Sequence, residues 1–280
     1  MPHITNGPAF HVDVIYIDAE TGQNAENTEV FPERFFGDEL EDGSRAVSAQ
    51  YTAAAADAPF YPAQWQPQQQ KAAEIGCWGC EFDVWLTADG VPVVYHDATI
   101  EGIRIEDTTF ASIMNHRLQN GEIVPTLQQY LQEARRHPNC RLIFEIKPHR
   151  NAKREGMISE LSVELVNMLG LANRTDYISF SKNICKRIHE LAPQAKVAYL
   201  NGDLSPKEIK EQGWTGIDYN VKVFEKQPNW AKEAKELGLE VNVWTVDGKE
   251  ELNRFATMPN IDIITTNEPT ILLKSNQHNP

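Results

Sequence analysis

From about residue 66 onward, short apolar runs alternate with amphipathic helical segments, and this alternation constrains the fold more than any other feature of the sequence. Strands are predicted at residues 79–86, 91–95, 141–147, 177–180, 196–200, 216–219, 240–246 and 261–265. Helices are predicted between them, at residues 126–137, 154–169, 182–191, 205–212, 229–237 and 248–257. Strands separated in this way by helices favour βα units and a parallel sheet.

The number of strands narrows the choice of fold. The run 91–95 directly follows the turn-forming pair Asp89-Gly90, so we expect it to return as a hairpin on the preceding strand. Seven βα units then remain, one fewer than a (β/α)8 TIM barrel requires. The early run 10–18 (FHVDVIYID) has strand-like alternation and is the candidate for the missing strand. A doubly wound sheet is the alternative, but the chain contains neither GxGxxG nor GxxxxGK[ST]. The pattern therefore favours the α/β class and a (β/α)8 TIM barrel, with the doubly wound sheet still open.

The first quarter of the chain differs from the rest in charge and in pattern. Residues 1–66 hold 11 acidic and two basic side chains, and so carry −9 of the formal net charge of −14. They contain no lysine, and residues 20–66 show neither a helical nor a strand period. We therefore expect an atypical, poorly ordered acidic segment over residues 1–66, in place of a normal first βα unit. The barrel domain is expected over residues 67–280.

Charge and hydropathy exclude some classes of partner. A sequence pI near 5.0 argues against nucleic acid as the main partner. No run approaches 18 apolar residues, so no transmembrane segment is predicted. The start MPHITNGPAF lacks a basic region followed by an apolar one, so no signal peptide is visible. The cytoplasm is the default compartment, export stays open, and nothing in the sequence indicates the oligomeric state.

The four cysteines invite a redox or zinc interpretation that their context does not favour. Cys77 and Cys80 form the sequence C-W-G-C, but a redox pair of this kind usually precedes a helix. Here a helical stretch precedes the pair and a strand follows it. A zinc site would need a second pair of ligands at suitable spacing, which the sequence lacks. Four reduced and mostly buried thiols are the expectation.

Two carboxylates lie two residues apart in the predicted strand 79–86. Glu81 and Asp83 therefore share one face of the strand, and the apolar Phe82 and Val84 share the other. On an edge strand the two charges would simply face water. A parallel barrel strand has no solvent-facing side, because helices cover its outside. In a barrel, a hard metal ion between the carboxylates is the better explanation.

The run RLIFEIK repeats this pattern. Arg141, Ile143, Glu145 and Lys147 share one of its faces. Glu145 adds a third carboxylate at the carboxyl end of a central strand, where it fits the same metal. Ligands that offer only oxygen favour Ca²⁺ or Mg²⁺ over zinc. Lys147, one pleat further on, could hold an anionic oxygen.

Two further side chains are candidates for the site. His96 follows the apolar run VPVVY and is a candidate general acid or base, with an ordinary loop histidine as the alternative. Trp244 shares a strand face with the polar Asn242 in VNVWTV. It is expected either to fill the barrel or to form the wall of a binding site.

Together these motifs resemble a known family. The run GCEFDVWLTADGVPVVYHD resembles the signature of the glycerophosphodiester phosphodiesterase family, with its spaced Glu and Asp, its Thr-x-Asp-Gly turn and its His-Asp pair. VPTLQQYL, FEIK, VNVWTV and ITTNEP are similar to later motifs of that family and occur in the same order. The resemblance covers about residues 70–275.

The resemblance implies a metal-dependent TIM barrel that cleaves glycerophosphodiesters to glycerol 3-phosphate and an alcohol. The cation would polarise a phosphoryl oxygen, and two histidines would exchange protons with the attacking and leaving oxygens. The implied site residues are ligands of Ca²⁺ or Mg²⁺ (Glu81, Asp83 and Glu145), one catalytic histidine (His96), a phosphate contact (Lys147) and a wall against the glycerol (Trp244).

The chain departs from the family at its first strand, which in the family ends in His-Arg-Gly. Only His3 and His11 precede Glu81 and neither is followed by arginine, so the first catalytic histidine has no assigned counterpart. Three hypotheses follow: an active enzyme with a diverged first strand, an impaired barrel that binds phosphodiester or metal, or a frame-shifted or misassigned segment over residues 1–66. A phosphoinositide-type phospholipase C is a further alternative, but it would not account for the tryptophan and proline motifs.

Overall fold

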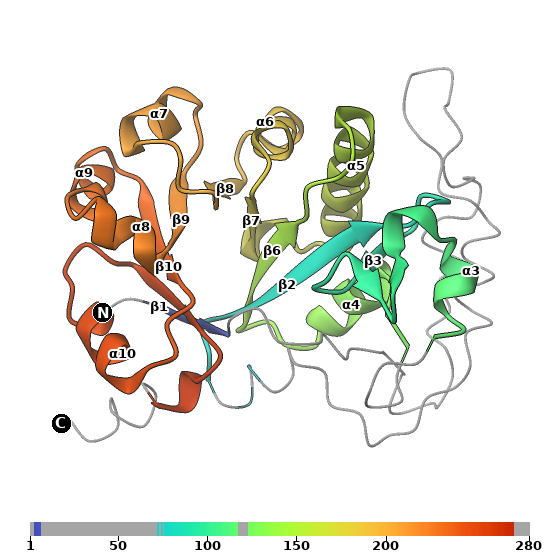
Figure 1. The fold of residues 1–280 in the computed structure, drawn as a ribbon, viewed down its shortest axis with the longest axis horizontal. Coiled ribbons are helices and arrows are strands. Elements are labelled where there is room, and N and C mark those ends of the chain that lie inside the picture. The colour runs from blue at the N-terminus through green and yellow to red at the C-terminus, as the bar shows by residue number, and fades with distance from the viewer. Residues whose placement is uncertain (1–2, 7–71, 73, 75, 117–122, 272–280) are drawn as a thin grey trace.

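The computed structural model describes residues 3–6, 72, 74, 76–116 and 123–271, and these form the (β/α)8 barrel fold that the sequence predicts. Eight parallel strands follow one another around a curled sheet (Figure 1). In order they are β1 (His3–Asn6), β2 (Gly79–Leu86), β6 (Arg141–Ile146), β7 (Thr175–Ser179), β8 (Lys196–Tyr199), β9 (Gly216–Asn220), β10 (Glu240–Trp244) and β11 (Ile263–Thr266). All of these except β1 coincide with predicted strands to within three residues at either end.

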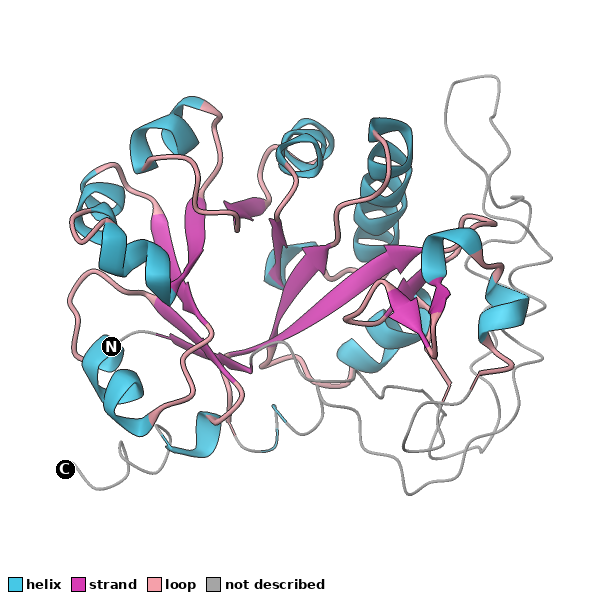
Figure 2. Cartoon of the chain, viewed as in Figure 1, coloured by secondary structure: helices cyan, strands magenta, loops and turns pink. Residues whose placement is uncertain are grey.

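Helices lie on the outer side of the curled sheet (Figure 2). They are α4 (Leu127–Ala134), α5 (Ala152–Met168), α6 (Lys182–Leu191), α7 (Pro206–Glu211), α8 (Val221–Lys226), α9 (Trp230–Glu236) and α10 (Lys249–Ala256), with the 3-10 turn η2 (Ala172–Arg174) before β7. The sequence did not predict α8, a six-residue helix that follows β9 without a linker. Among the described residues, no helix is both long and apolar enough to cross a membrane.

The first strand lies earlier in the chain than the sequence suggested. Its place in the barrel is taken by His3–Asn6, which pairs with β11 along its whole length and with β2 through Thr5–Gly79 and Asn6–Cys80. The predicted strand at 10–18 lies outside the described residues. The division of the chain at residue 66 also stays a prediction, because residues 7–71 are outside the described part.

The hairpin predicted after β2 is confirmed. Gly90 adopts a φ of 84°, a left-handed conformation that favours glycine, and lets β3 (Pro92–Val94) return antiparallel to β2. In the described residues between β3 and α4 there are four short elements: β4 (Thr99–Ile100), β5 (Ile103–Arg104), η1 (Ile105–Asp107) and α3 (Phe110–Ile113). Each is too short to show a period in the sequence. They lie beside β3, away from the arc of helices (Figure 1).

The predicted helix boundaries have the local chemistry expected of them. Ser205 accepts a hydrogen bond from the backbone N–H of Glu208, whose side chain accepts in return from the Ser205 N–H, and Pro206 occupies the first turn of α7. At the end of α9, Gly238 adopts a φ of 74° and the next residue donates its N–H to the Ala234 carbonyl at 2.8 Å.

Packing on the outer face of β2 fixes which residues point inward. The Phe82 ring lies 4.2 Å from the ring of Tyr130 on α4 and 4.7 Å from that of Phe144 on β6, measured between centroids. Side chains alternate along a strand. Glu81 and Asp83 therefore point into the barrel, and the apolar layer between sheet and helices determines their direction.

The barrel interior is stratified by polarity. At the amino ends of the strands, Arg141 pairs with Asp176, and Lys196 pairs with Glu240 at 2.6 Å. Above these ion pairs lies an apolar cluster formed by Ile143, Ile178 and Leu200, with Trp78, Phe180, Ala198 and Trp244 packed against it. Asp83 and Glu145 lie toward the carboxyl ends of β2 and β6, and so on the far side of this apolar layer from the ion pairs.

All four cysteines are free and buried, as expected. Cys77, Cys80 and Cys140 pack together with Ala72 near the amino ends of β2 and β6. Burial raises the pKa of the Cys77 thiol to about 12 and that of Cys140 to about 11. Protonated thiols are poor nucleophiles, which agrees with the packing role that the sequence context favours.

Replacing Phe82 with alanine tests the outer layer without touching the inward carboxylates. Phe82→Ala is expected to lower the free energy of unfolding by about 3–5 kcal/mol, because it leaves a cavity between β2 and α4. Met168, with 40% of its surface exposed, offers the control. Met168→Ala should change stability by no more than about 0.5 kcal/mol in the same denaturant titration. Equal losses in the two variants would contradict the packing described.

Candidate functional site

Three carboxylates from two neighbouring strands meet inside the barrel. Glu81 and Asp83 come from β2 and Glu145 from β6, where the pairing of the strands sets Asp83 opposite Glu145. One oxygen of each lies within 4.8 Å of the others. All three side chains are buried, with Asp83 fully inaccessible.

The carboxylates lack the partners that burial normally requires. Neither oxygen of Glu81 has a hydrogen-bond partner among the described residues. Burial, together with the charges of Asp83 and Glu145, raises the pKa of Glu81 well above its usual range. Burial and the charge of Asp83 raise the pKa of Glu145 to about 8. Protons or a bound cation must therefore compensate this cluster.

Lys147 is the cation that the fold itself brings to the cluster. Its ammonium lies 2.6 Å from Asp83 Oδ1 and 2.9 Å from Glu145 Oε1. Burial alone would lower the pKa of Lys147, but the carboxylates of Glu145 and Asp83 outweigh it and raise the pKa. One ammonium cannot neutralise three carboxylates, so the site has room for a further positive charge.

The donor set suits a divalent cation that prefers oxygen. Hard cations such as Ca²⁺ and Mg²⁺ bind carboxylate oxygens, and the unpartnered Glu81 oxygens point into the cluster with Asp83 and Glu145. Among the described residues this is the one group of three or more acidic, histidine or cysteine ligands with such a spacing. The buried acidic triad therefore fits a metal site.

A cavity of about 120 Å³ opens beside the triad and brings the other predicted residues together. Its lining is Glu81, His96, Glu145, Lys147, Ile178, Phe180, Leu200, Asp218, Trp244 and Thr265. Five of the six side chains singled out from the sequence line it, and the sixth, Asp83, contacts Lys147 just behind it.

His96 is held at the rim of this cavity with about a third of its side chain exposed (36%). Its Nδ1 lies 2.8 Å from the Asp97 carboxylate, and the Trp85 indole donates to its backbone carbonyl at 3.2 Å. A carboxylate accepts hydrogen bonds, so Nδ1 carries the proton in this pair and Nε2 is the nitrogen with a lone pair. The neighbouring Asp97, whose role the sequence did not identify, thus sets the tautomer.

Trp244 forms an apolar wall of the cavity. Its indole Nε1 donates to the backbone carbonyl of Asp218 at 2.8 Å, and its ring meets that of Phe180 edge-on at 5.6 Å. These contacts hold the ring across the barrel from the triad.

Sequence reasoning missed two residues that the structure brings to the site. Asp218 is a buried carboxylate on β9 that lines the cavity. The signal that singled out Glu81 was present for Asp218 as well, since GIDYN places one acidic residue in a short parallel strand. His149 follows β6 in the run KPHR, and nothing in its spacing distinguishes it from the other histidines.

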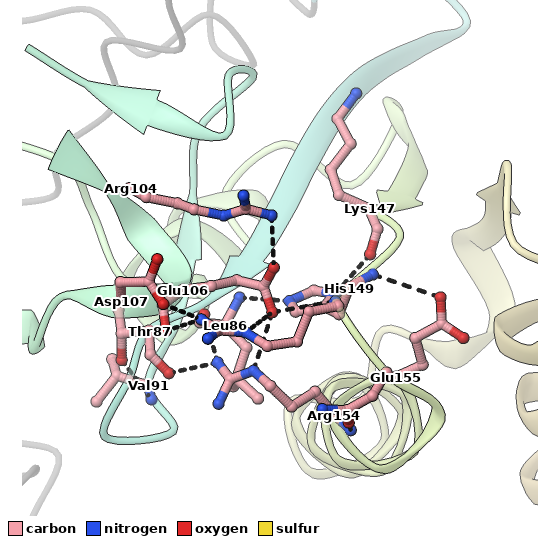
Figure 3. A network of polar contacts seen from close by, with 12 residues as sticks. Leu86, Thr87, Val91, Arg104, Glu106, Asp107, Lys147, His149, Arg154 and Glu155 are labelled. Atoms are coloured by element: carbon pink, nitrogen blue, oxygen red, sulfur yellow. Dashed lines mark hydrogen bonds and ion pairs between the residues drawn. The ribbon is translucent and has the colours of Figure 1, made fainter. Parts of the chain in front are cut away.

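His149 ties the carboxyl ends of β2 and β6 together. Its Nδ1 lies 2.7 Å from the Lys147 carbonyl, and its Nε2 accepts the backbone N–H of Leu86 at 2.9 Å. Nδ1 must therefore donate and Nε2 must stay unprotonated, so the ring is neutral. Burial lowers the pKa of His149 to about 4, in agreement with this tautomer. Figure 3 shows the ring between the two strand ends, with the Lys147 ammonium pointing away from it.

A second cross-link to the end of β2 comes from α5. Arg154 donates to the carbonyl oxygens of Leu86 and Thr87 at 2.8 and 2.6 Å, and its Nε bonds the buried carboxylate of Glu106 at 3.0 Å. Burial alone would raise the pKa of Glu106, but nearby cationic groups lower it, so the carboxylate stays ionised. This network anchors the strand that carries Glu81 and Asp83 (Figure 3).

Comparison with known proteins places this geometry in context. Residues 67–271 match the family model described as the glycerophosphoryl diester phosphodiesterase family. A crystal structure of a glycerophosphodiester phosphodiesterase from Parabacteroides distasonis is similar, at 46% identity and a TM-score of 0.72. The match covers 75% of this chain and 89% of that one.

Two further relatives are glycerophosphodiester phosphodiesterases. Glycerophosphodiester phosphodiesterase from Caldanaerobacter subterraneus subsp. tengcongensis is 26% identical over 226 residues, which cover 73% of this chain and 88% of that protein. Mouse glycerophosphodiester phosphodiesterase 1 is 37% identical over 94 residues, which cover 29% of this chain. That match spans 28% of the length of the mouse protein.

The neutral His149 predicts a pH dependence of stability. The unfolded chain binds a proton at His149 near pH 6.5 and the folded chain only near pH 4, so stability is full above pH 6.5 and falls as the pH drops through this window. His149→Gln removes this titration and should give a flatter dependence between pH 4 and 6.5 in denaturant titrations. His189→Gln, on the outer helix α6, should keep the native slope. Parallel curves for the native chain and His149→Gln would contradict the assigned tautomer.

Proposed function

We propose that this chain, which belongs to the glycerophosphoryl diester phosphodiesterase family, hydrolyses glycerophosphodiesters to glycerol 3-phosphate and an alcohol. Membership follows from the family match over residues 67–271, well over half of the chain. The observation that carries the proposed activity is the cavity itself. The cavity is large enough for a small organic ligand. It is surrounded by buried carboxylates without enough opposite charge, by a lysine, a histidine and a tryptophan.

Glu81, Asp83 and Glu145 would hold the cation. Oxygen-only ligands support Ca²⁺ or Mg²⁺. When bound, such a cation supplies positive charge that polarises a phosphoryl oxygen. Lys147 already touches two of the three carboxylates, at 2.6 and 2.9 Å. Once these carboxylates are compensated, the Lys147 ammonium becomes available to an anionic oxygen of the substrate.

The remaining side chains orient the substrate and move protons. Trp244 offers an apolar face to the carbon chain of the glycerol. His96 accepts or donates a proton at Nε2, because Asp97 holds the Nδ1 proton and stabilises the imidazolium that forms. Burial of Glu81 and Glu145 keeps bulk water from the charges that act on the phosphoryl group.

A second candidate function rests on the first strand. Among the described residues, His96 is the one histidine that lines the cavity, and β1 ends at Asn6 where the family signature has His-Arg-Gly. A barrel that binds a phosphodiester or a cation but turns it over poorly would fit this arrangement. Turnover by the native chain decides between the two functions.

The activity test uses the full chain with glycerophosphocholine or glycerophosphoethanolamine and Ca²⁺ or Mg²⁺. Release of glycerol 3-phosphate is expected, and a chelator should abolish it. Glu81→Gln should lower turnover at least about 100-fold. Mutating a residue that only hydrogen-bonds to a metal ligand already costs about 10- to 100-fold, and Glu81 would be a ligand itself. Glu250→Gln, the same change at an exposed position on α10, should leave turnover unchanged.

Cation binding without turnover would favour the impaired barrel instead. A cyclic inositol phosphate released from a phosphoinositide, with no glycerol 3-phosphate from the glycerophosphodiesters, would favour the phospholipase C alternative. Turnover that resists both the chelator and Glu81→Gln would contradict the proposed site.

A further inference from the structure

Asp218 is a buried carboxylate in the cavity that the proposed chemistry does not use. It lies on β9, is 2% exposed and lines the same cavity as Glu81 and Lys147. Its Oδ1 has no hydrogen-bond partner among the described residues. A buried acceptor without a partner carries a free-energy cost, and in a cavity that cost is relieved when a ligand donates to it.

The position of Asp218 separates it from the acidic triad. Strands β2 and β9 are four places apart in the ring of eight, so their inward side chains lie on opposite walls of the barrel. Asp218 also does not belong to the group of carboxylates that gather within 4.8 Å. A role as a fourth ligand of the same cation is therefore not supported.

The surroundings of Asp218 favour a neutral hydroxyl over other ligand groups. A carboxylate repels a phosphoryl oxygen, which belongs at the opposite wall beside Lys147. Trp244 is bonded to the Asp218 backbone, and Phe180 and Leu200 complete an apolar lining between the two walls. Burial raises the pKa of Asp218 to about 7, an effect that the adjacent Asn242 amide reduces. A donor from a ligand would further favour the ionised acceptor.

The dimensions agree with a short polyol. One water molecule needs only about 10–15 Å³ of such a volume. A cavity of about 120 Å³ therefore has room for several groups of that size, such as the atoms of a three-carbon chain. A ligand with a phosphoryl group at one end and hydroxyls at the other would meet Lys147 on one wall and Asp218 on the other. Its carbon chain would lie against Trp244.

We infer that Asp218 Oδ1 accepts a hydrogen bond from a hydroxyl of the glycerol moiety and makes the cavity selective for hydroxylated phosphoesters. This inference rests on the proposed function, since it assigns the end of the cavity that receives the glycerol. Asp218 is then a specificity-determining residue that touches the substrate without taking part in the phosphoryl chemistry.

The test compares two ligands that differ only in hydroxyls, sn-glycerol 3-phosphate and n-propyl phosphate. Their affinities are measured by calorimetry on the full chain with Ca²⁺ or Mg²⁺. The native chain should prefer glycerol 3-phosphate by about 10- to 100-fold, the value of a hydrogen bond to a charged acceptor. Asp218→Ala should reduce this preference to less than about threefold, because both ligands then lack an acceptor.

Two further variants keep the test sharp. Asp218→Asn retains the shape and a neutral acceptor, so its preference should fall to roughly the square root of the native value, about three- to tenfold. If Asp218→Ala does not fold, the comparison between the native chain and Asp218→Asn provides the test. Asp203→Ala removes a carboxylate that pairs with Lys182 outside the cavity and should keep the native preference.

An unchanged preference in Asp218→Ala or Asp218→Asn would overturn the assignment of Asp218 while native turnover still supports the proposed function. A native chain that neither turns over glycerophosphocholine nor binds glycerol 3-phosphate would overturn both.

Discussion

The site depends on one electrostatic constraint, the burial of three carboxylates with a single ammonium beside them. Each buried charge costs several kcal/mol unless an opposite charge compensates it. Among the described cations, Lys147 pairs with Asp83 and Glu145, and Glu81 has no ion-pair partner. If all three were ionised, the cluster would carry a net charge of −2 inside the barrel. A divalent cation has the charge that balances it, and protons on Glu81 and Glu145 are the alternative in its absence.

The rest of the fold holds this unfavourable cluster in place. Phe82 packs against α4 and so turns its neighbours inward. The carboxyl end of β2 is fixed from two sides, by His149 at the Leu86 N–H and by Arg154 at the Leu86 carbonyl. Both residues bond backbone groups, so they position the carboxylates without competing for them. The ionised Glu106 in turn orients Arg154, because it accepts a hydrogen bond from the Arg154 Nε–H.

How far the sequence predicts this site depends on how local each signal is. β2 was predicted at its observed bounds because its alternation is long and its two faces differ, and the inward direction of Glu81 and Asp83 followed from barrel topology. The first strand was not found, because four residues carry no period and its pairing with β2 and β11 is visible only in three dimensions.

Asp218 and His149 show the same limit at the level of single residues. Asp218 is one acidic residue in a short strand. What distinguishes it is its place in the cavity lining, opposite the acidic triad, and this is visible only in three dimensions. His149 acquires its tautomer from two backbone groups that are 61 positions apart in the chain, Leu86 and Lys147. Spacing in the sequence cannot report such contacts. Strand alternation singled out the three carboxylates and indicated a metal ion, and the family resemblance agreed with it, while the structure added the distances and the partners that the alternation could not give.

The most direct test of this account is calorimetry of Ca²⁺ or Mg²⁺ binding to the metal-free chain at pH 7 in buffers of different ionisation enthalpy. Because the pKa of Glu145 is raised to about 8 and that of Glu81 is also raised, the metal-free site holds protons that a cation must displace. The account predicts net proton release on binding, tighter binding as the pH rises from 7 toward 8, and loss of both in Glu81→Gln. Binding without proton release, or binding that persists in Glu81→Gln, would contradict it.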